Sequence, residues 1–519
     1  MSKPPPIPPH RTDPQPGSAE QRRTSRRRFL EAGLAAATLP IGAGVFAARP
    51  AAAAQPTADA TGSRPNLLIL MTDQERTEVV LPSGFSLPAR DRVASDGVTF
   101  GLHHTPTAPC SPARSTVFTG LHAPVNGVLD NVGAAQPDLS ATIPTLGTMV
   151  KAAGYHTCYI GKWHLTQNIT TDPAYLTPYG FDEAIDLLAG GTPNEGTQQD
   201  PGVAQQAEAW LAAHAADSQP WLCVVSFVNP HDMMFCPRFY RLDDVPDYGA
   251  AVPTNFESDL SSKPPVQTVW RGENEAVGGA MPNAVAAPDD AHQWRQWGNW
   301  YLELLRRTDV LMSGVLDALD ASGRAADTVV VRLADHGEMG GGHGLRQKGA
   351  MIYQENLRVP LVIADPRRPA THGSTSTALT SHIDVVPTLA SLAGIDATAF
   401  GPLVGHDLTV LLDQPGGSVR TSLLVTSDAT SSGLGLPGLR YCIRGVLTAR
   451  YSFGRYTTPD GIDSPPSGYT FECYDRLADP GELHNLANDP SRASLLKDLN
   501  DLVNQLIADE LQVGGTAHA

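Results

Sequence analysis

The chain alternates short, continuously apolar runs with segments that have the spacing of amphipathic helices. The apolar runs occupy residues 65–73, 156–164, 221–232, 328–337 and 359–365. Runs of this length that are apolar on both faces are typical of strands buried inside a sheet. Helical patterns separate them at 143–154, 203–214, 300–319 and 383–394. This alternation predicts an α/β sandwich built around a large, mostly parallel central sheet.

The pattern changes at about residue 420. Short alternating runs at 421–428, 440–456 and 469–475 are followed by an amphipathic helical pattern at 494–507. They predict a smaller C-terminal α+β subdomain with an antiparallel sheet over 421–519, after a main α/β domain over 65–420. Within the main domain, residues 233–295 are polar and rich in proline, and we interpret them as a long excursion that covers a pocket.

The N-terminus resembles an export signal rather than part of a fold. Arg26 and Arg27 belong to an arginine cluster that precedes a weakly apolar run and the small residues Ala52–Ala54. We therefore expect a twin-arginine (Tat) signal peptide over 1–54 and a linker over 55–64. A basic tail with a membrane anchor fits less well, because the apolar run is short and rich in alanine and glycine. The expected mature chain has no stable membrane span and is secreted or retained in the cell envelope or periplasm.

The charge balance limits the kinds of partner. The whole chain has a formal net charge of −17, and its first 54 residues alone carry +5, so the expected mature chain is more acidic still. Such a chain is a poor electrostatic match for nucleic acid or for long polyanions. A small anionic substrate remains compatible if its pocket carries local positive charge.

Four of the apolar runs end in polar or charged residues. In open α/β sheets, ligands bind outside the carboxyl ends of the strands, so side chains at these ends are expected to form one site. The residues concerned are Asp73, Lys162, His164, His231, Asp232, Asp335 and His336.

The six cysteines have the spacing of neither a zinc site nor a dense disulfide framework. Cys223 lies in an apolar run and is expected to be a small buried side chain. Cys110 is different, because it begins the sequence C-S-P-A-R. If Cys110 has a special role, the other five cannot all pair, and their pairing stays open.

The sequence C-S-P-A-R, followed by T-G at 119–120, resembles the signature of type I sulfatases of the alkaline phosphatase superfamily. In that signature the cysteine of Cys-x-Pro-x-Arg is oxidised to formylglycine (3-oxoalanine). Five further blocks, one before this signature and four after it, fall in the family's order between about residues 65 and 487. They are N-L-L-I-L-M-T-D-Q, G-K-W-H-L, N-P-H-D, A-D-H-G-E-M-G-G-G-H-G-L-R-Q-K and Y-D-R-L-A-D-P-G-E-L-H-N-L-A.

The resemblance implies a sulfuric ester hydrolase acting on a small sulfate ester. A formylglycine at Cys110, installed by a formylglycine-generating enzyme before Tat export, hydrates to a geminal diol. One hydroxyl attacks the sulfur, and the second allows the diol to collapse and expel sulfate. A serine would lack that second step.

The resemblance also implies one divalent metal ion, bound by Asp73, Gln74, Asp335 and His336 together with modified Cys110. Many sulfatases have a second acid in place of Gln74 and an amide in place of His336. The set found here is closer to choline sulfatases and phosphonate monoester hydrolases. Carboxylate and amide oxygens suit Ca²⁺, which leads on family frequency, and the imidazole leaves Mn²⁺ as the alternative.

Five further residues receive roles from the resemblance. Arg114 braces the diol and the carboxylates, Lys162 and Lys348 hold the sulfate oxygens, and two histidines move protons. Of these, His164 accepts the proton of the diol and His231 stabilises the departing alkoxide. His343 either contacts substrate or supports a turn.

Three other functions compare with this pattern as follows. A phosphonate monoester or phosphodiester hydrolase could use the same formylglycine site, because a phosphoryl centre resembles a sulfuryl centre in shape. A non-catalytic binding module would not require the intact set of Asp73, Arg114 and Lys348. A zinc phosphatase would need more histidine ligands than we can place at these strand ends. The sequence does not identify the alcohol that leaves.

Overall fold

The computed structural model describes residues 64–77, 79–133, 136–256, 259–281, 291–349, 351–429, 440–458 and 468–512. The predicted signal peptide and all of the predicted linker except Arg64 lie outside these residues. Within them, no helix combines the length and the apolar character that crossing a membrane requires.

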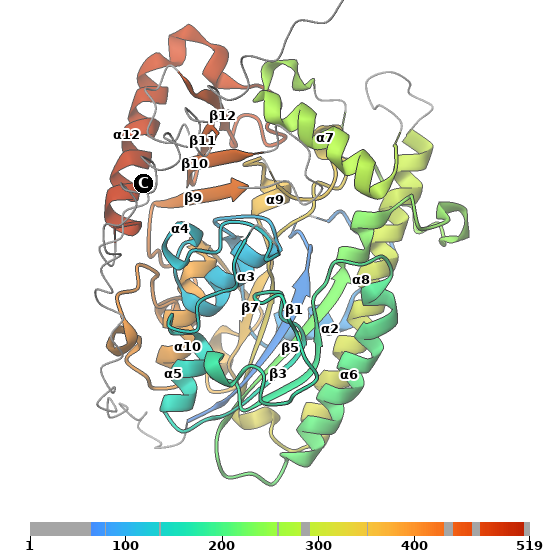
Figure 1. Cartoon of the computed structure of the whole chain (residues 1–519), viewed down its shortest axis with the longest axis vertical. Coiled ribbons are helices and arrows are strands. Elements are labelled where there is room, and N and C mark those ends of the chain that lie inside the picture. Colours follow the sequence, from blue (N-terminus) through green and yellow to red (C-terminus); the bar gives the residue numbers. More distant parts are fainter. Residues whose placement is uncertain are drawn as a thin grey trace, which may run out of the picture. The chain divides into compact units, whose positions relative to one another are not determined.

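The main sheet has eight strands in the order β4-β3-β5-β1-β6-β7-β2-β8 (Figure 1). All neighbouring strands pair in parallel except at β7, which runs antiparallel to both β6 and β2. The prediction of a large, mostly parallel sheet is therefore confirmed. The strands are β1 (Asn66–Asp73), β2 (Val98–His104), β3 (His156–Lys162), β4 (Glu183–Leu188), β5 (Trp221–Pro230), β6 (Thr328–Ala334), β7 (Leu361–Ala364) and β8 (Ser374–Ser381).

Helices cover both faces of this sheet, which explains why its central strands are apolar throughout. In β1, Leu67 and Ile69 belong to a core shared with α3, α5 and α10, whereas Leu68 and Leu70 belong to a core shared with α2, α6 and α8. Burying each such side chain contributes about 1.5–3 kcal/mol relative to exposure. The helices are α2 (Pro88–Ser95), α3 (Cys110–Thr119), α5 (Leu146–Ala152), α6 (Glu195–Ala213), α8 (Ala291–Ala321) and α10 (Val385–Leu392).

The predicted antiparallel C-terminal sheet is also present. Its strands are β9 (Ser422–Ala429), β10 (Tyr441–Thr448), β11 (Tyr451–Thr457) and β12 (Thr470–Asp475), in the order β12-β11-β10-β9. The closing helix α12 (Ala493–Glu510) lies beside this sheet and buries Leu499 and Val503 against Val446 and Phe453 (Figure 1).

The structure differs from the sequence analysis in the region 233–295. This stretch contains helix α7 (Pro265–Gly278), and α8 begins at Ala291. The aromatic residues Trp294, Trp297 and Tyr301 recur at helical spacing and pack into one core, which extends the helix beyond the predicted start. Strand β8 was not predicted, because its S-T-S-T-A-L-T-S sequence is mostly polar. Three short helices complete the regular elements described here: α4 (Ala123–Asn126), α9 (Gln354–Leu357) and α11 (Thr409–Asp413).

Candidate active site

The structure brings the predicted site residues together at the carboxyl end of the main sheet. Strands β3, β5, β1 and β6 are adjacent and mutually parallel, so their carboxyl ends share one edge. The side chains of the predicted site residues are all buried except that of His164, which is half-buried. Six cysteines, all in the described part of the chain, are free and buried, and Cys223 is fully buried as predicted.

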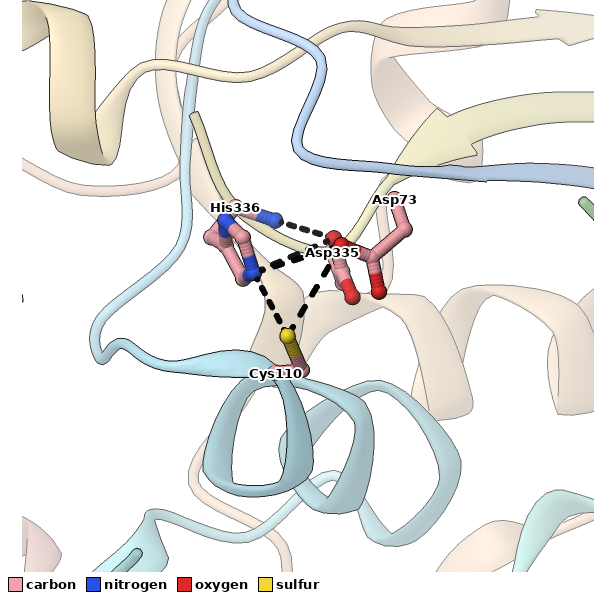
Figure 2. A group of neighbouring side chains, drawn as sticks. All are labelled: Asp73, Cys110, Asp335 and His336. Carbon is pink, nitrogen blue, oxygen red and sulfur yellow. Dashed lines mark hydrogen bonds and ion pairs between the residues drawn. The ribbon is translucent and has the colours of Figure 1, made fainter. Parts of the chain in front are cut away.

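Cys110 is the first residue of α3, at the positive end of that helix. Its sulfur lies 3.1 Å from His336 Nε2 and 3.7 Å from Asp73 Oδ1 (Figure 2). Burial and the charge of Asp73 act to raise the pKa of the thiol, but Lys162, Lys348 and His336 outweigh them, so the pKa lies below its usual value. Position 110 therefore favours a negatively charged atom.

Arg114 follows Cys110 by one helical turn, which places both side chains on the same face of α3. Its Nε donates to Asp335 Oδ2 at 2.9 Å and its Nη2 donates to Asp73 Oδ2 at 3.1 Å. The remaining nitrogen, Nη1, donates to the carbonyl of Lys162 at 2.7 Å and to Ser226 Oγ at 3.0 Å. One guanidinium thus fixes two carboxylates, the end of β3 and the middle of β5. Sequence reasoning missed Ser226, because it lies inside the apolar run of β5.

Asp73 and Asp335 are two fully buried carboxylates in one site. Burial acts to raise the pKa of Asp73, but the charges of Lys162 and Arg114 bring it well below its usual value. Lys162 Nζ lies 2.5 Å from Asp73 Oδ2. Burial and the charge of Asp73 raise the pKa of Asp335 instead. Two neighbouring carboxylates whose pKa values are driven apart favour a cation between them.

The ligand atoms of Asp73, Cys110, Asp335 and His336 all lie within 4.8 Å of one another. His336 Nδ1 lies 3.0 Å from the carbonyl oxygen of Gly337, so its Nε2 is the nitrogen turned toward the group (Figure 2). This backbone contact is the usual device that orients a ligating histidine. Two carboxylates, one imidazole and the sulfur of Cys110 form a donor set that fits a divalent cation.

Gln74 lies beside this group, and its amide is already engaged. Its Oε1 accepts a hydrogen bond from Lys348 Nζ at 2.6 Å, and its Nε2 donates to Glu338 Oε2 at 2.5 Å. Its role as a metal ligand stays a prediction. The contact does bring Lys348 to the same edge of the sheet as the carboxylates.

Two residues just beyond the strand ends have backbones in the left-handed region. Gln74 follows β1 with φ 68° and His164 follows β3 with φ 54°. Such conformations are costly for residues with side chains and are concentrated at functional sites. Gly161, with φ 96°, has no alternative, since a Cβ there would lie 2.2 Å from the carbonyl oxygen of Ser226.

The basic side chains Lys162, His164 and His231 differ in charge, because the lysine is charged and the two histidines are neutral. A Cβ on Gly190 would lie 2.1 Å from Lys162 Cε, so this glycine leaves the space that the lysine side chain fills. The pKa values of His164 and His231 lie well below the usual value, because burial and the charge of Lys162 disfavour the imidazolium. The Nδ1 atoms of both rings have no hydrogen-bond partner among the described residues. Both imidazoles are therefore neutral and available to exchange protons.

Sequence reasoning also missed two supporting residues. Glu338 accepts the backbone N–H groups of Gly340 at 2.9 Å and Gln347 at 2.6 Å, which holds the glycine-rich loop. His382 Nε2 lies 2.7 Å from the backbone oxygen of Asp335. Glu338 lies within the A-D-H-G-E block, and that block was the available signal. For His382 the local sequence offered none.

His343 and Asp232 have structural contacts. The ring of His343 stacks on Tyr353 with 3.8 Å between the ring centroids, and its backbone has φ 56°. These contacts favour the supporting role that was one of its two alternatives. Asp232 accepts the backbone N–H groups of Gly196 and Thr197 and anchors the start of α6.

The eight-stranded α/β sandwich is the fold of a solved 2-O GAG sulfatase and of a solved phosphonate monoester hydrolase. The family model named Sulfatase matches residues 65–395, which is more than half of the chain. The chain belongs to the sulfatase family, and its enzyme class is that of the sulfuric ester hydrolases.

Three similar proteins illustrate the relationship. The chain is 29% identical to uncharacterized sulfatase YidJ of Escherichia coli (strain K12), over 84% of this chain and 86% of that protein. It is 27% identical to a choline-sulfatase of Rhizobium meliloti (strain 1021), over 83% and 84%. The crystal structure of the phosphonate monoester hydrolase of Agrobacterium radiobacter superposes with a TM-score of 0.65 and 24% identity, covering 87% of this chain and 97% of that one. The last comparison supports the fold.

Proposed function

We propose that this sulfatase is formylglycine-dependent and uses one divalent cation. The observation that carries the proposal is the position of Cys110: its sulfur lies against Asp73 and His336, one helical turn from Arg114. Conversion of the Cys110 thiol removes the sulfur and two hydrogens and adds one oxygen, with an oxidant supplied by a formylglycine-generating enzyme. Asp73, Gln74, Asp335, His336 and the modified residue 110 would hold the cation.

The formylglycine and the cation supply part of the proposed chemistry, and the chain's other side chains supply the rest. The hydrated aldehyde supplies an attacking hydroxyl, and the bound cation lowers the pKa of that hydroxyl. Lys162 and Lys348 neutralise the oxygens of the sulfate ester. The negative charge of the ester offsets these two lysines, which restores basicity to His164 and His231.

The two histidines then have separate tasks. His164 accepts the proton of the second diol hydroxyl as sulfate departs. His231 donates a proton or hydrogen bond to the alcohol oxygen released when the sulfur–oxygen bond of the ester breaks. Arg114 keeps Asp73 and Asp335 in place throughout. Replacing His231 by alanine should reduce kcat more for a poor leaving group than for an activated phenol.

Ca²⁺ is the proposed ion because carboxylate and amide oxygens dominate the donor set. Mn²⁺ is the alternative, because His336 adds a nitrogen donor. Metal analysis of the protein purified without added metal distinguishes the two ions. Recovery of activity after chelation, measured separately with each ion, provides the second readout.

The proposed substrate is a small sulfate ester. The acidic surface repels long sulfated polymers, and the buried site supplies its own positive charge through Lys162 and Lys348. Hydrolysis of a phosphonate monoester at the same site is the second candidate, supported by the Gln74 and His336 pair. Relative kcat/KM values for an aryl sulfate and an aryl phosphonate decide between them.

We also propose that the protein is exported by the Tat pathway. A protein that crosses the membrane folded can be oxidised at Cys110 and loaded with metal before export, and would then be secreted or periplasmic. Sequencing the N-terminus of the mature protein tests cleavage near Gln55. Export should stop when Arg26 and Arg27 are both replaced by lysine.

The decisive experiment is the mass of the peptide that contains residue 110. The proposal expects a product in which oxygen has replaced sulfur with the loss of two hydrogens. A fully active, metal-loaded protein that retains an unmodified thiol at this position would overturn it.

A further inference from the structure

A second group of metal-ligating side chains lies at the opposite end of the main sheet from the active site. His156 is the first residue of β3, Glu183 is the first residue of β4, and His214 caps the C-terminus of α6. Strand β3 ends at Lys162 in the active site, and its seven residues separate the two ends by about 20 Å. The group is therefore independent of the catalytic centre.

The spacing of the three side chains suits a transition-metal ion. His156 Nε2 lies 2.9 Å from Glu183 Oε1, and His214 Nε2 lies 3.9 Å from the same oxygen. One ligand atom from each residue falls within 4.8 Å of the others. Zinc bonds of about 2.0–2.1 Å in a tetrahedral site place ligand atoms about 3.3 Å apart, midway between the two separations seen here.

The orientation of His214 is fixed by contacts that a ligating histidine requires. Its Nδ1 lies 2.8 Å from the backbone oxygen of Trp210, so this nitrogen carries the proton and Nε2 carries the lone pair. The Trp210 ring stacks on the imidazole with 4.0 Å between centroids and 22° between planes. Trp210 Nε1 also donates to Glu183 Oε1 at 3.0 Å, which holds the carboxylate toward the histidines.

A simple ion pair does not account for all three residues. His156 and Glu183 are close enough to pair directly, but 3.9 Å is too long for a hydrogen bond from His214 to Glu183. Side-chain exposures of 24%, 33% and 19% for His156, Glu183 and His214 leave the group accessible to an ion from solvent.

We propose that His156, Glu183 and His214 form a Zn²⁺ site, with water as the fourth ligand. The ion would fasten the edge strand β4 to β3 and to the end of α6. The other end of α6 holds Asp232 through Gly196 and Thr197, next to His231. The site is structural: it stabilises the folded enzyme by binding the native state alone.

The test uses the mature, Ca²⁺-loaded protein and Zn²⁺ itself. Calorimetric titration should show a Zn²⁺ site in addition to any binding at the catalytic centre, and Zn²⁺ should raise Tm. His214→Gln should weaken this binding by at least about tenfold, and His156→Gln with His214→Gln should abolish it. His484→Gln is the matched control, because His484 also lies beside an acid, Asp479, but belongs to no three-ligand group among the residues that the structure describes.

The test of the Zn²⁺ site can fail independently of the proposed catalytic function. Turnover without added Zn²⁺ should be the same in wild type and in the His156 and His214 variants, which also reports that they fold. X-ray absorption of the Zn²⁺-bound protein should show two imidazole ligands that the double variant lacks. Equal Zn²⁺ stoichiometry and equal Tm shifts in wild type and double variant would overturn the proposal, as would no binding at micromolar Zn²⁺.

Discussion

His336 Nε2 lies 3.1 Å from the Cys110 sulfur, and neither side chain is exposed to solvent. In the proposed formylglycine, an oxygen would replace this sulfur on the same side chain. It would then complete a set of donors with the buried carboxylates of Asp73 and Asp335. The residue at position 110 thus serves both the proposed metal site and the proposed nucleophile.

Cys110→Ser separates these two roles. A serine hydroxyl can attack the sulfate ester once, but it lacks the second hydroxyl that expels sulfate. We expect kcat to fall at least about 10³-fold, with one sulfate retained on the protein and an unchanged Tm. Intact mass after incubation with substrate measures the retained sulfate. Cys223→Ser, at another buried cysteine, should keep full turnover, and steady turnover by Cys110→Ser would contradict the mechanism.

Arg114→Lys tests the guanidinium that joins the carboxylates. Lysine cannot reproduce the simultaneous bonds from Nε to Asp335 and from Nη2 to Asp73. Disrupting a buried charge network of this kind costs about 3–5 kcal/mol. We expect a lower Tm in chelator and a partial recovery with excess Ca²⁺, since the ion offsets the carboxylate charge that the substitution leaves unpaired. A Tm equal to that of wild type in chelator would count against this account.

Chelation of the metal should change the protonation of the site. In the apo protein, burial and the charge of Asp73 raise the pKa of Asp335. Ca²⁺ binds the ionised carboxylate, so binding should release protons and should tighten as the pH rises. Calorimetric titrations in buffers with different ionisation enthalpies measure the number released. Asp335→Asn should remove most of this release, and a release unchanged by that substitution would assign the proton to another group.

The sequence predicted the site better than it predicted the elements that support it. Asp73 and Lys162 each end an apolar strand, and His231 and Asp335 each directly follow one. The parallel order of these strands brings their ends together. That inference needs only local pattern and the geometry of a parallel sheet.

Contacts from distant segments could not be predicted in this way. The bond between His382 and the backbone of Asp335 joins residues 47 positions apart, and the packing of β8 beside β2 fixes it. Strand β8 is polar in sequence, so apolar periodicity gave no sign of it. Likewise, the pairing of His156 with Glu183 depends on the register of β3 against β4, which no local pattern specifies.

Glu482 provides a stability test away from the active site. Its side chain is buried and accepts hydrogen bonds from Ser452 Oγ at 2.6 Å and from the backbone N–H of Gln354 at 2.9 Å. Burial, aided by the nearby charge of Glu355, raises its pKa to about 8. An acid whose pKa is raised on folding stabilises the fold fully below its unfolded pKa of about 4.3. That contribution is lost as the pH rises toward 8 and does not change further above it.

Replacing Glu482 by glutamine should therefore remove a pH dependence. Wild type should lose a few kcal/mol of stability between about pH 5 and 8 that Glu482→Gln retains, because the amide keeps the shape of the protonated acid without ionising. Tm measured by calorimetry at pH 5, 6.5 and 8 reports the difference. Glu303→Gln is the control: the pKa of Glu303 is lowered to about 2, against the effect of burial, by hydrogen bonds from Arg306 and Tyr248, so its ionisation is complete before pH 5. A wild-type slope that persists in Glu482→Gln would show that other groups carry the titration.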